Sequence, residues 1–293
     1  MSEPETLDAA LLRRFPLPRH PEDGDKEERG LALLIAGSRE LSGAAQLAGM
    51  AALRAGAGKL RIATSETIAL GLGIALPEAR IIAFTDDEEG CIHRDSVERL
   101  VRRCEGVDSL TIGPGLQHGP TLAELLTAVL ESGGNYPLVL DAAALGVLPP
   151  LAARLRAWRG GSVLLPHAGE MARLLECDRE IVVADPLAAA RTAADTFGAV
   201  ALVKGQWSFV VAPDGRSFRF LGGGIGLATS GSGDTLAGIV GGLAARGAAP
   251  LTAALWGVYL HGEAGRTLTR DVGRVGFLAR EIPDLIPGLM QAV

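Results

Sequence analysis

The sequence predicts an α/β fold in which a mostly parallel central sheet is covered by helices on both faces. Short apolar runs alternate along most of the chain with longer segments whose small and apolar residues recur at helical spacing. This alternation is typical of a parallel sheet, because each crossover helix covers one face of the sheet. In addition, several apolar runs stop at Gly, Asp or Lys, as buried strands do where they enter loops.

The expected elements follow in chain order. Strands are expected at residues 31–36, 59–64, 79–84, 109–112, 137–140, 162–165 and 199–203. Helices are expected at residues 42–55, 65–72, 95–104, 121–131, 150–158 and 186–197. After Lys204 the pattern changes, since residues 208–212 and 217–221 flank a Pro-Asp-Gly-Arg turn and predict a hairpin. A small-residue helix that stops near Arg246, a helix at 251–268 and a last helix from about Phe277 complete the expected set.

The length of the chain allows one large α/β domain or two small ones. The chain has 293 residues, which is enough to bury a sizeable core. Residues 1–29 are charged and rich in turn formers, so we expect an N-terminal arm there. We expect residues 30–293 to form a single domain, because no repeat, low-complexity tract or linker interrupts them.

Charge and cysteine content exclude several classes of protein. A net charge of -6 argues against non-specific binding to nucleic acid or to an anionic membrane. The three cysteines are far apart and form no CxxC, so neither a disulfide framework nor a zinc site is indicated. The first residues do not resemble an export signal, and Arg246 and Pro250 interrupt the longest apolar run. We therefore expect a cytoplasmic protein.

The most informative stretch is the glycine-rich segment at residues 222–247. Glycines let backbone N–H groups approach a ligand closely, and such groups at a helix start bind phosphate. Asp234 follows Gly231, Ser232 and Gly233 in what would be the first helical turn. A carboxylate there would repel a bound phosphate, which indicates chemistry beside the phosphate. The alternative is that Asp234 only caps the helix and the glycines form a mobile turn.

Other candidate residues lie at the expected carboxyl ends of strands, where open parallel sheets bind ligands. They are Gly37, Ser38, Gly113, Gly115, Asp141, His167, Glu170, Lys204 and Gly205. Each has an alternative role. Lys204 could bind a phosphate or be solvated, and Asp141 could hold a magnesium-bound water or a substrate hydroxyl, or cap a helix. His167 and Glu170, with no third ligand, favour a structural pair over a metal site.

The segment ATSGSGDTLAG at residues 228–238 resembles the A-x-x-G-[TS]-G-D-x-L-A-G signature of ADP- or ATP-dependent NAD(P)H-hydrate dehydratases, which have a ribokinase-like fold. Further segments resemble that family in order, at residues 37–64, 75–80, 111–116, 164–175 and 203–216. The resemblance spans about residues 31–268, which is most of the chain.

This resemblance implies a hydro-lyase that repairs hydrated NADH or NADPH, using ADP or ATP and Mg²⁺. The terminal phosphoryl group would pass to the ring hydroxyl, and phosphate would then be eliminated. By position, Asp234 would be the catalytic base, with Gly231, Ser232 and Gly233 around the phosphoryl group. The resemblance implies nucleotide contacts at Lys204, Gly205, Ser208, Gly223, Gly224 and Thr229. It implies substrate contacts at Ala44, Gly115, Asp141, His167 and Glu170, and no metal-binding residue.

The resemblance also implies a homo-oligomer, since members of the family are often tetramers, and a separate epimerase. Two positions depart from the family pattern: Ala143 replaces a second aspartate and Gly224 replaces an asparagine. Two other functions stay open. One is a small-molecule kinase of the same fold, acting on a thiazole or pyridoxal derivative, and the other is a non-catalytic nucleotide-binding sensor.

Overall fold

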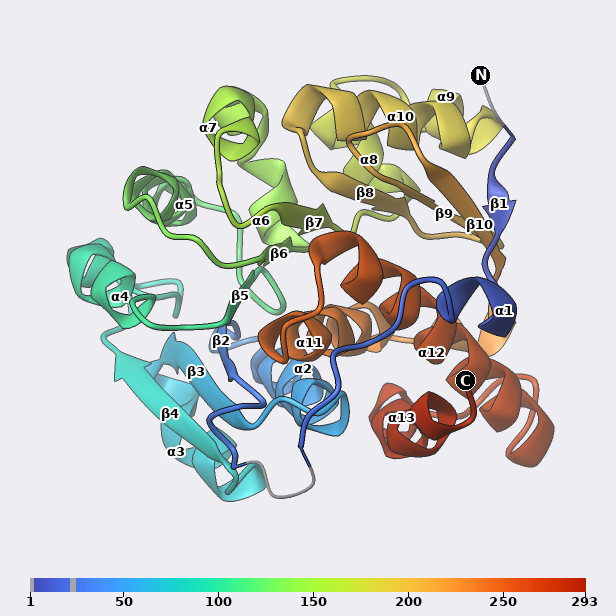
Figure 1. Cartoon of the computed structure of the whole chain (residues 1–293). Coiled ribbons are helices and arrows are strands. Elements are labelled where there is room, and N and C mark those ends of the chain that lie inside the picture. The colour runs from blue at the N-terminus through green and yellow to red at the C-terminus, as the bar shows by residue number, and fades with distance from the viewer. Residues whose placement is uncertain (1–2, 22–24) are drawn as a thin grey trace.

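The computed structural model describes residues 3–21 and 25–293, and its centre is one ten-stranded sheet (Figure 1). The strand order is β1-β10-β9-β8-β7-β6-β5-β2-β3-β4. The strands are β1 (Glu5–Thr6), β2 (Leu31–Ile35), β3 (Lys59–Ser65), β4 (Ala79–Phe84), β5 (Ser109–Ile112), β6 (Leu138–Leu140), β7 (Ser162–Leu164), β8 (Val200–Val203), β9 (Trp207–Val211) and β10 (Ser217–Leu221).

The sheet is mostly parallel, as the sequence predicts. In register, Leu33 of β2 lies opposite Arg61 of β3 and Leu110 of β5. The exception is β9, which is antiparallel to both β8 and β10. The expected hairpin is therefore confirmed, although its first strand begins one residue earlier, at Trp207.

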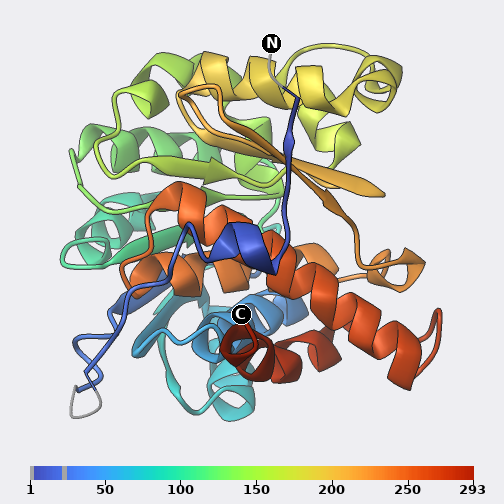
Figure 2. The ribbon, with the colours of Figure 1, turned by 45° about the vertical axis from the view of Figure 1, so that its right-hand side comes forward.

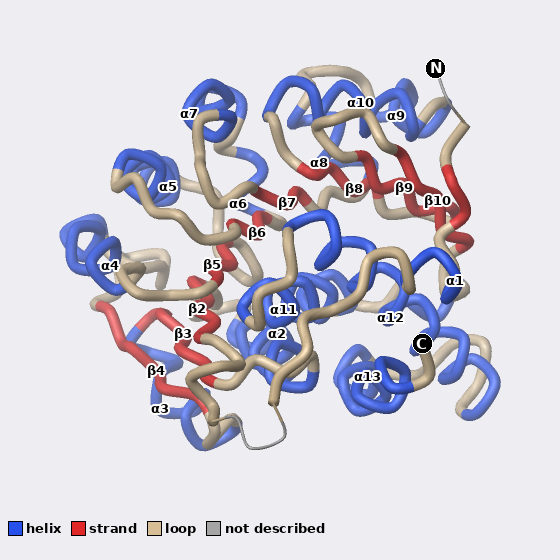
Figure 3. Tube along the Cα trace, in the orientation of Figure 1, coloured by secondary structure: helices blue, strands red, loops and turns tan. Residues whose placement is uncertain are grey.

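Helices cover both faces of the sheet, which Figure 3 shows as blue tubes on either side of the red strands. One face carries α4 (Val97–Arg103), α5 (Pro120–Glu131), α6 (Ala143–Gly146), α7 (Ala152–Arg156), α8 (Ala168–Leu174), α9 (Arg179–Ala184) and α10 (Pro186–Phe197). The other carries α1 (Ala9–Leu12), α2 (Ser42–Arg54), α3 (Glu66–Ala75), α11 (Ser232–Ala245), α12 (Pro250–Asp271) and α13 (Ile282–Gln291). In β2, Leu33 and Ile35 enter one apolar core while Ala32 and Leu34 enter another. This explains why a strand covered on both faces is a continuous apolar run.

The small residues of α11 allow it to pack very closely on α2. A Cβ on Gly238 would lie 2.1 Å from the carbonyl oxygen of Ala48, and one on Gly242 would lie 2.3 Å from that of Ala52. No side chain fits at these positions, so the glycines set the distance between the two helices. They thereby fix the start of α11 relative to the sheet.

The N-terminal arm contributes structure that the sequence does not predict. Strand β1, in blue, lies along the edge of the sheet and pairs in parallel with β10 (Figure 2). Leu7, Leu11 and Leu12 are buried in the core. Residues 1–2 and 22–24 of the expected arm lie outside the described residues. No helix within 3–21 and 25–293 is long and apolar enough to cross a membrane.

Short helices at loop ends are the other differences. Helices α6, α8 and α9 follow strands β6 and β7 and are absent from the sequence-based expectation. The last helix begins at Ile282 rather than near Phe277, which is 1% exposed and packs into the core ahead of it. Segments of this length carry too little periodicity to be recognised from sequence.

Candidate active site

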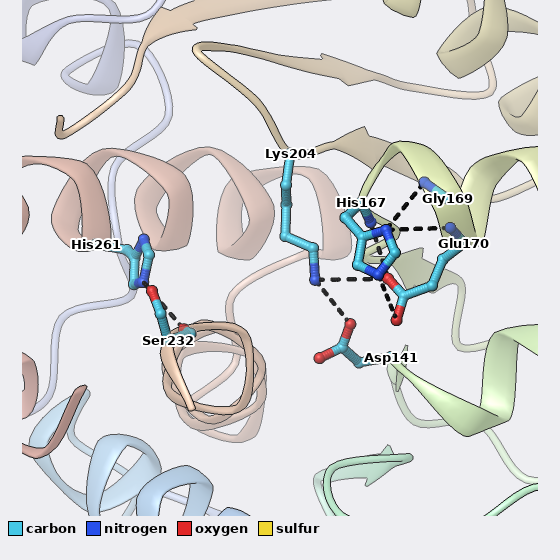
Figure 4. Close-up of polar contacts among 7 residues, drawn as sticks. All are labelled: Asp141, His167, Gly169, Glu170, Lys204, Ser232 and His261. Carbon is cyan, nitrogen blue, oxygen red and sulfur yellow. Dashed lines mark hydrogen bonds and ion pairs between the residues drawn. The ribbon is translucent and has the colours of Figure 1, made fainter. Parts of the chain in front are cut away.

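Lys204 and Asp141 meet at the carboxyl edge of the sheet, beyond β8 and β6 (Figure 4). The Lys204 Nζ donates a hydrogen bond to the Asp141 Oδ1 at 3.0 Å and lies 4.0 Å from the Glu170 Oε2. The side chains of Lys204, Asp141 and Glu170 are 22%, 3% and 11% exposed. Lys204 is thus part of a partly buried ionic cluster rather than a solvated residue. Asp141 does not cap α6 with its side chain, since the residue at that N-cap is Ala142.

The charges in this cluster depend on each other. Burial raises the pKa of Asp141 and Glu170 raises it further, while Lys204 opposes both. For Lys204, burial lowers the pKa, but the charges of Asp141 and Glu170 outweigh it and the net shift is upward. A lysine with a raised pKa stays positively charged at neutral pH. The edge of the sheet therefore holds a fixed cation.

Asp234 lies in the first turn of α11 and is half-buried. Burial raises its pKa to about 6, Asp141 and Glu170 raise it as well, and Lys204 opposes them. A carboxyl group with a pKa near the working pH can exchange a proton readily, which suits a general base. A purely structural carboxylate at a helix start would normally be stabilised in its ionised form.

The start of α11 faces the lysine. A Cβ on Gly233 would lie 3.5 Å from the Lys204 Nζ and 3.8 Å from the Asp141 Oδ2. The first N–H groups of a helix have no intrahelical acceptor, and here they open beside a cation. The N-cap, Gly231, has φ +85°, and a Cβ there would lie 2.3 Å from the Leu47 Cδ1. Packing therefore defines the loop conformation at Gly231. Free amides beside a cation are suited to binding a phosphoryl group.

His167 and Glu170 form a capping box at the start of α8. The His167 Nδ1 accepts hydrogen bonds from the amides of Gly169 and Glu170 at 3.0 and 3.2 Å. The Glu170 Oε2 accepts a hydrogen bond from the His167 amide at 2.9 Å. This geometry is that of the structural pair considered from the sequence. The His167 side chain is nevertheless 56% exposed, so its ring faces solvent beside the Lys204 cluster.

The other predicted substrate residues, Ala44 and Gly115, lie close to each other. Gly115 has φ +66°, and a Cβ there would lie 2.7 Å from the Ala44 Cβ. Gly113 approaches the next strand end so closely that its Cβ would lie 1.8 Å from the Asp141 carbonyl oxygen. These contacts bring the β5 loop, the start of α2 and Asp141 to one edge. Ala142 adopts φ +48°, which is unusual for a residue other than glycine and places local strain next to Asp141.

The predicted nucleotide residues lie between β8 and α11. Gly205 directly follows Lys204, and the amide of Gly222 donates to the Gln206 carbonyl oxygen at 2.8 Å, which ties the two loops together. Ser208 belongs to β9, and the Thr229 carbonyl oxygen accepts from the Ser232 amide at 3.3 Å.

The glycine pair in this loop has its own constraints. A Cβ on Gly223 would lie 2.3 Å from the Gly262 carbonyl oxygen. Gly224 has φ +95°, and asparagine tolerates a positive φ better than most residues other than glycine. The glycine that replaces the family's asparagine therefore allows the same backbone conformation. At the other departure from the family pattern, Ala143 is 4% exposed and sits in the apolar core.

His261 is a site residue that the sequence does not reveal. Its Nε2 lies 2.9 Å from the Ser232 Oγ and 3.0 Å from the Ser232 carbonyl oxygen. Burial lowers the pKa of this histidine to about 4. A lone histidine in a largely apolar helix gives no signal in the sequence, because its partner is 29 residues away.

Comparison with known proteins gives consistent results. Residues 32–288 match the family described as NAD(P)H-hydrate dehydratase. An ADP-dependent (S)-NAD(P)H-hydrate dehydratase from Xanthomonas campestris pv. campestris is 46% identical over 288 residues, covering 97% of this chain and 96% of the relative. A bifunctional NAD(P)H-hydrate repair enzyme from Moorella thermoacetica is 37% identical, and the match covers 95% of this chain but only 52% of that protein.

Among solved structures, the fold is similar to that of ADP/ATP-dependent NAD(P)H-hydrate dehydratase from Bacillus subtilis, which was co-crystallised with ATP and Mg²⁺. The TM-score is 0.85 at 28% identity, and the match covers 100% of this chain and 99% of that one. The likeness therefore extends from the glycine loop to the whole architecture.

Proposed function

This chain belongs to the NAD(P)H-hydrate dehydratase family, and we propose that the Lys204 edge is where it dehydrates hydrated NADH or NADPH with ADP as phosphoryl donor. The observation that carries the residue assignment is a half-buried carboxyl group, Asp234, whose pKa is raised to about 6 at a helix start that faces a lysine. That arrangement places a proton acceptor beside a phosphoryl site.

The proposed reaction has two stages. Asp234 takes the proton of the ring hydroxyl as that oxygen attacks the terminal phosphorus, and the bond from phosphorus to the leaving nucleotide breaks. The original carbon–oxygen bond, which now joins the ring to phosphate, then breaks and phosphate leaves with its electron pair. A neighbouring ring carbon loses a proton, and the electron pair of that carbon–hydrogen bond forms the ring double bond. The amides of Gly231, Ser232 and Gly233 and the charge of Lys204 offset the negative charge that develops in transfer.

The residues present fit a magnesium ion bound mainly through phosphate. Mg²⁺ usually takes one or two carboxylates and completes its shell with water and phosphate oxygens. Asp141 and Glu170 offer carboxylate oxygens at this edge, 3.0 and 4.0 Å from the Lys204 Nζ, and Asp234 offers another in the first turn of α11. Within the described part of the chain, no group of three or more His, Cys, Asp or Glu side chains is arranged to hold a metal. When bound, the ion would neutralise phosphate charge.

Nucleotide binding can be tested by thermal or urea denaturation. A ligand that binds only the native state adds about 2.7 kcal/mol of stability at a concentration about 100 times its dissociation constant. We expect ADP with magnesium to stabilise the protein and Lys204→Ala to weaken that effect. An unchanged melting temperature at millimolar ADP and ATP would count against the nucleotide site.

The decisive assay combines NADH hydrate with ADP or ATP and follows the absorbance of restored dihydronicotinamide together with free phosphate. We expect both products in equal amounts, and more with ADP. A stable phosphorylated alcohol would support the kinase alternative, and binding without turnover would support the sensor. The same proposal includes a cytoplasmic location, a homo-oligomer and a separate epimerase. The particle mass in solution tests whether the protein is a homo-oligomer.

A further inference from the structure

His261 reaches the start of α11 from a different helix. It belongs to α12, whereas Ser232 is the first residue of α11, and the histidine ring contacts both oxygen atoms of that residue. The Nε2 is 2.9 Å from the Ser232 Oγ and 3.0 Å from the Ser232 carbonyl oxygen. In Figure 4, Ser232 lies between His261 and the Lys204–Asp141 pair. The histidine therefore contacts the start of α11 through Ser232.

The carbonyl oxygen determines where the proton of His261 lies. A carbonyl oxygen can only accept a hydrogen bond, so we assign the proton to Nε2. With the proton on Nδ1 instead, the Nε2 lone pair and the carbonyl oxygen would repel each other at 3.0 Å. Burial lowers the pKa of His261 to about 4, and the positive charge of Lys204 also acts to lower it. The ring is thus neutral at physiological pH, with Nε2 as a donor.

This assignment fixes the direction of the Ser232 hydroxyl. Because the protonated Nε2 of His261 has no lone pair, it cannot accept a hydrogen bond from the Ser232 hydroxyl 2.9 Å away, so the proton of that hydroxyl must be directed elsewhere. Ser232 is 5% exposed, so the surrounding atoms leave its hydroxyl proton few directions in which to point. The next residue, Gly233, faces Lys204. We infer that His261 is a positioning residue for the dehydratase reaction, holding the Ser232 hydroxyl so that it donates to the phosphoryl group being transferred. This inference rests on the proposed function.

A double-mutant cycle tests the inference with Ser232→Ala, His261→Phe and both together. Losing one donor to developing negative charge typically lowers turnover on the order of 10²- to 10³-fold. We expect Ser232→Ala to approach that range, and His261→Phe to lose roughly tenfold because the hydroxyl remains but is misplaced. The double variant should match Ser232→Ala within a few-fold, since His261 acts only through that hydroxyl. Additive losses would overturn the inference.

Two controls separate positioning from packing. His261→Gln keeps an N–H donor at similar reach, and we expect it to retain most of the turnover that His261→Phe loses. Tyr259→Phe, on the same helix, removes a hydroxyl without touching Ser232 and should leave turnover unchanged. If Phe and Gln at position 261 lose activity equally, in parallel with their melting temperatures, the role is structural and the inference fails.

A measurement on the unmodified protein keeps the test independent of folding and of turnover. Nitrogen-15 shifts of the histidine side chains should report His261 as neutral and protonated at Nε2 at pH 7. An Nδ1-protonated ring would overturn the inference even if the enzyme is active. If NADH hydrate is not turned over, the proposed function fails instead, while the nitrogen-15 result still tests the proton assignment.

Discussion

Replacing Asp234 with asparagine should raise stability while abolishing most of the activity. The pKa of Asp234 rises from an ordinary value of 3.8 to about 6, chiefly because of burial. A difference of one in pKa corresponds to about 1.36 kcal/mol, so the ionised carboxylate costs the folded state at most about 3 kcal/mol at neutral pH. Asparagine has the same shape as aspartate but no charge. Asp234→Asn should therefore raise the free energy of unfolding by up to that amount.

The sign of this effect depends on pH. The folded state binds the proton more tightly than the unfolded state, so the wild type loses stability as pH rises from about 4 through about 6. The advantage of Asp234→Asn should therefore be small near pH 4 and largest above pH 7. Urea unfolding at several pH values measures it. Asparagine cannot accept the hydroxyl proton, so turnover should fall on the order of 10²- to 10⁴-fold.

Turnover and stability of this variant test the role of Asp234 together. A variant within a few-fold of wild-type turnover would remove Asp234 from the mechanism. A variant with no gain in stability at pH 8 would show that the carboxylate is well accommodated when ionised, contrary to the raised pKa. ADP affinity on the same folded variant is the control, and it should hold or increase because a negative charge beside phosphate is removed.

The wild-type pH profile and three further substitutions probe the charges of the site and the packing of α11. The kcat/KM for the hydrate should rise with pH and level off above a pKa near 6, since Asp234 must be ionised to act; a flat profile from pH 5 to 8 would contradict this. Lys204→Ala leaves two carboxyl groups without their cation and should lower the free energy of unfolding in urea by about 3–5 kcal/mol. The loss should be smaller at pH 5 than at pH 8, because the carboxyl groups take up protons at the lower pH. Gly238→Ala should destabilise by about 1–3 kcal/mol through its clash with α2. Gly71→Ala, in the open on α3, should instead stabilise by roughly 1 kcal/mol, and equal effects would refute the packing argument.

The sequence alone determined the alternation of strands and helices and the hairpin, and it predicts a site at the carboxyl edge of the sheet. These follow from local patterns: buried strands are continuous apolar runs, and ligands collect at the carboxyl ends of parallel strands. Asp234 is a candidate from the sequence because an acidic residue in a glycine-rich helix start conflicts with phosphate binding unless it has a chemical role. The family motifs predicted the substrate, because the spacing of apolar residues contains no information about it.

The tertiary structure alone decided which residues touch. Lys204 and Asp141 are 63 positions apart, and His261 and Ser232 are 29 apart, so no local pattern links either pair. The glycines of α11 could have been a mobile turn, but Gly231 and Gly238 leave no space for a side chain against α2. The N-terminal segment that forms β1 is likewise expected from its charge to be an arm outside the domain. It becomes a strand only because β10 is there to pair with it. The raised pKa of Asp234 has the same origin, because burial and the fields of Asp141 and Glu170 exist only once distant segments fold together.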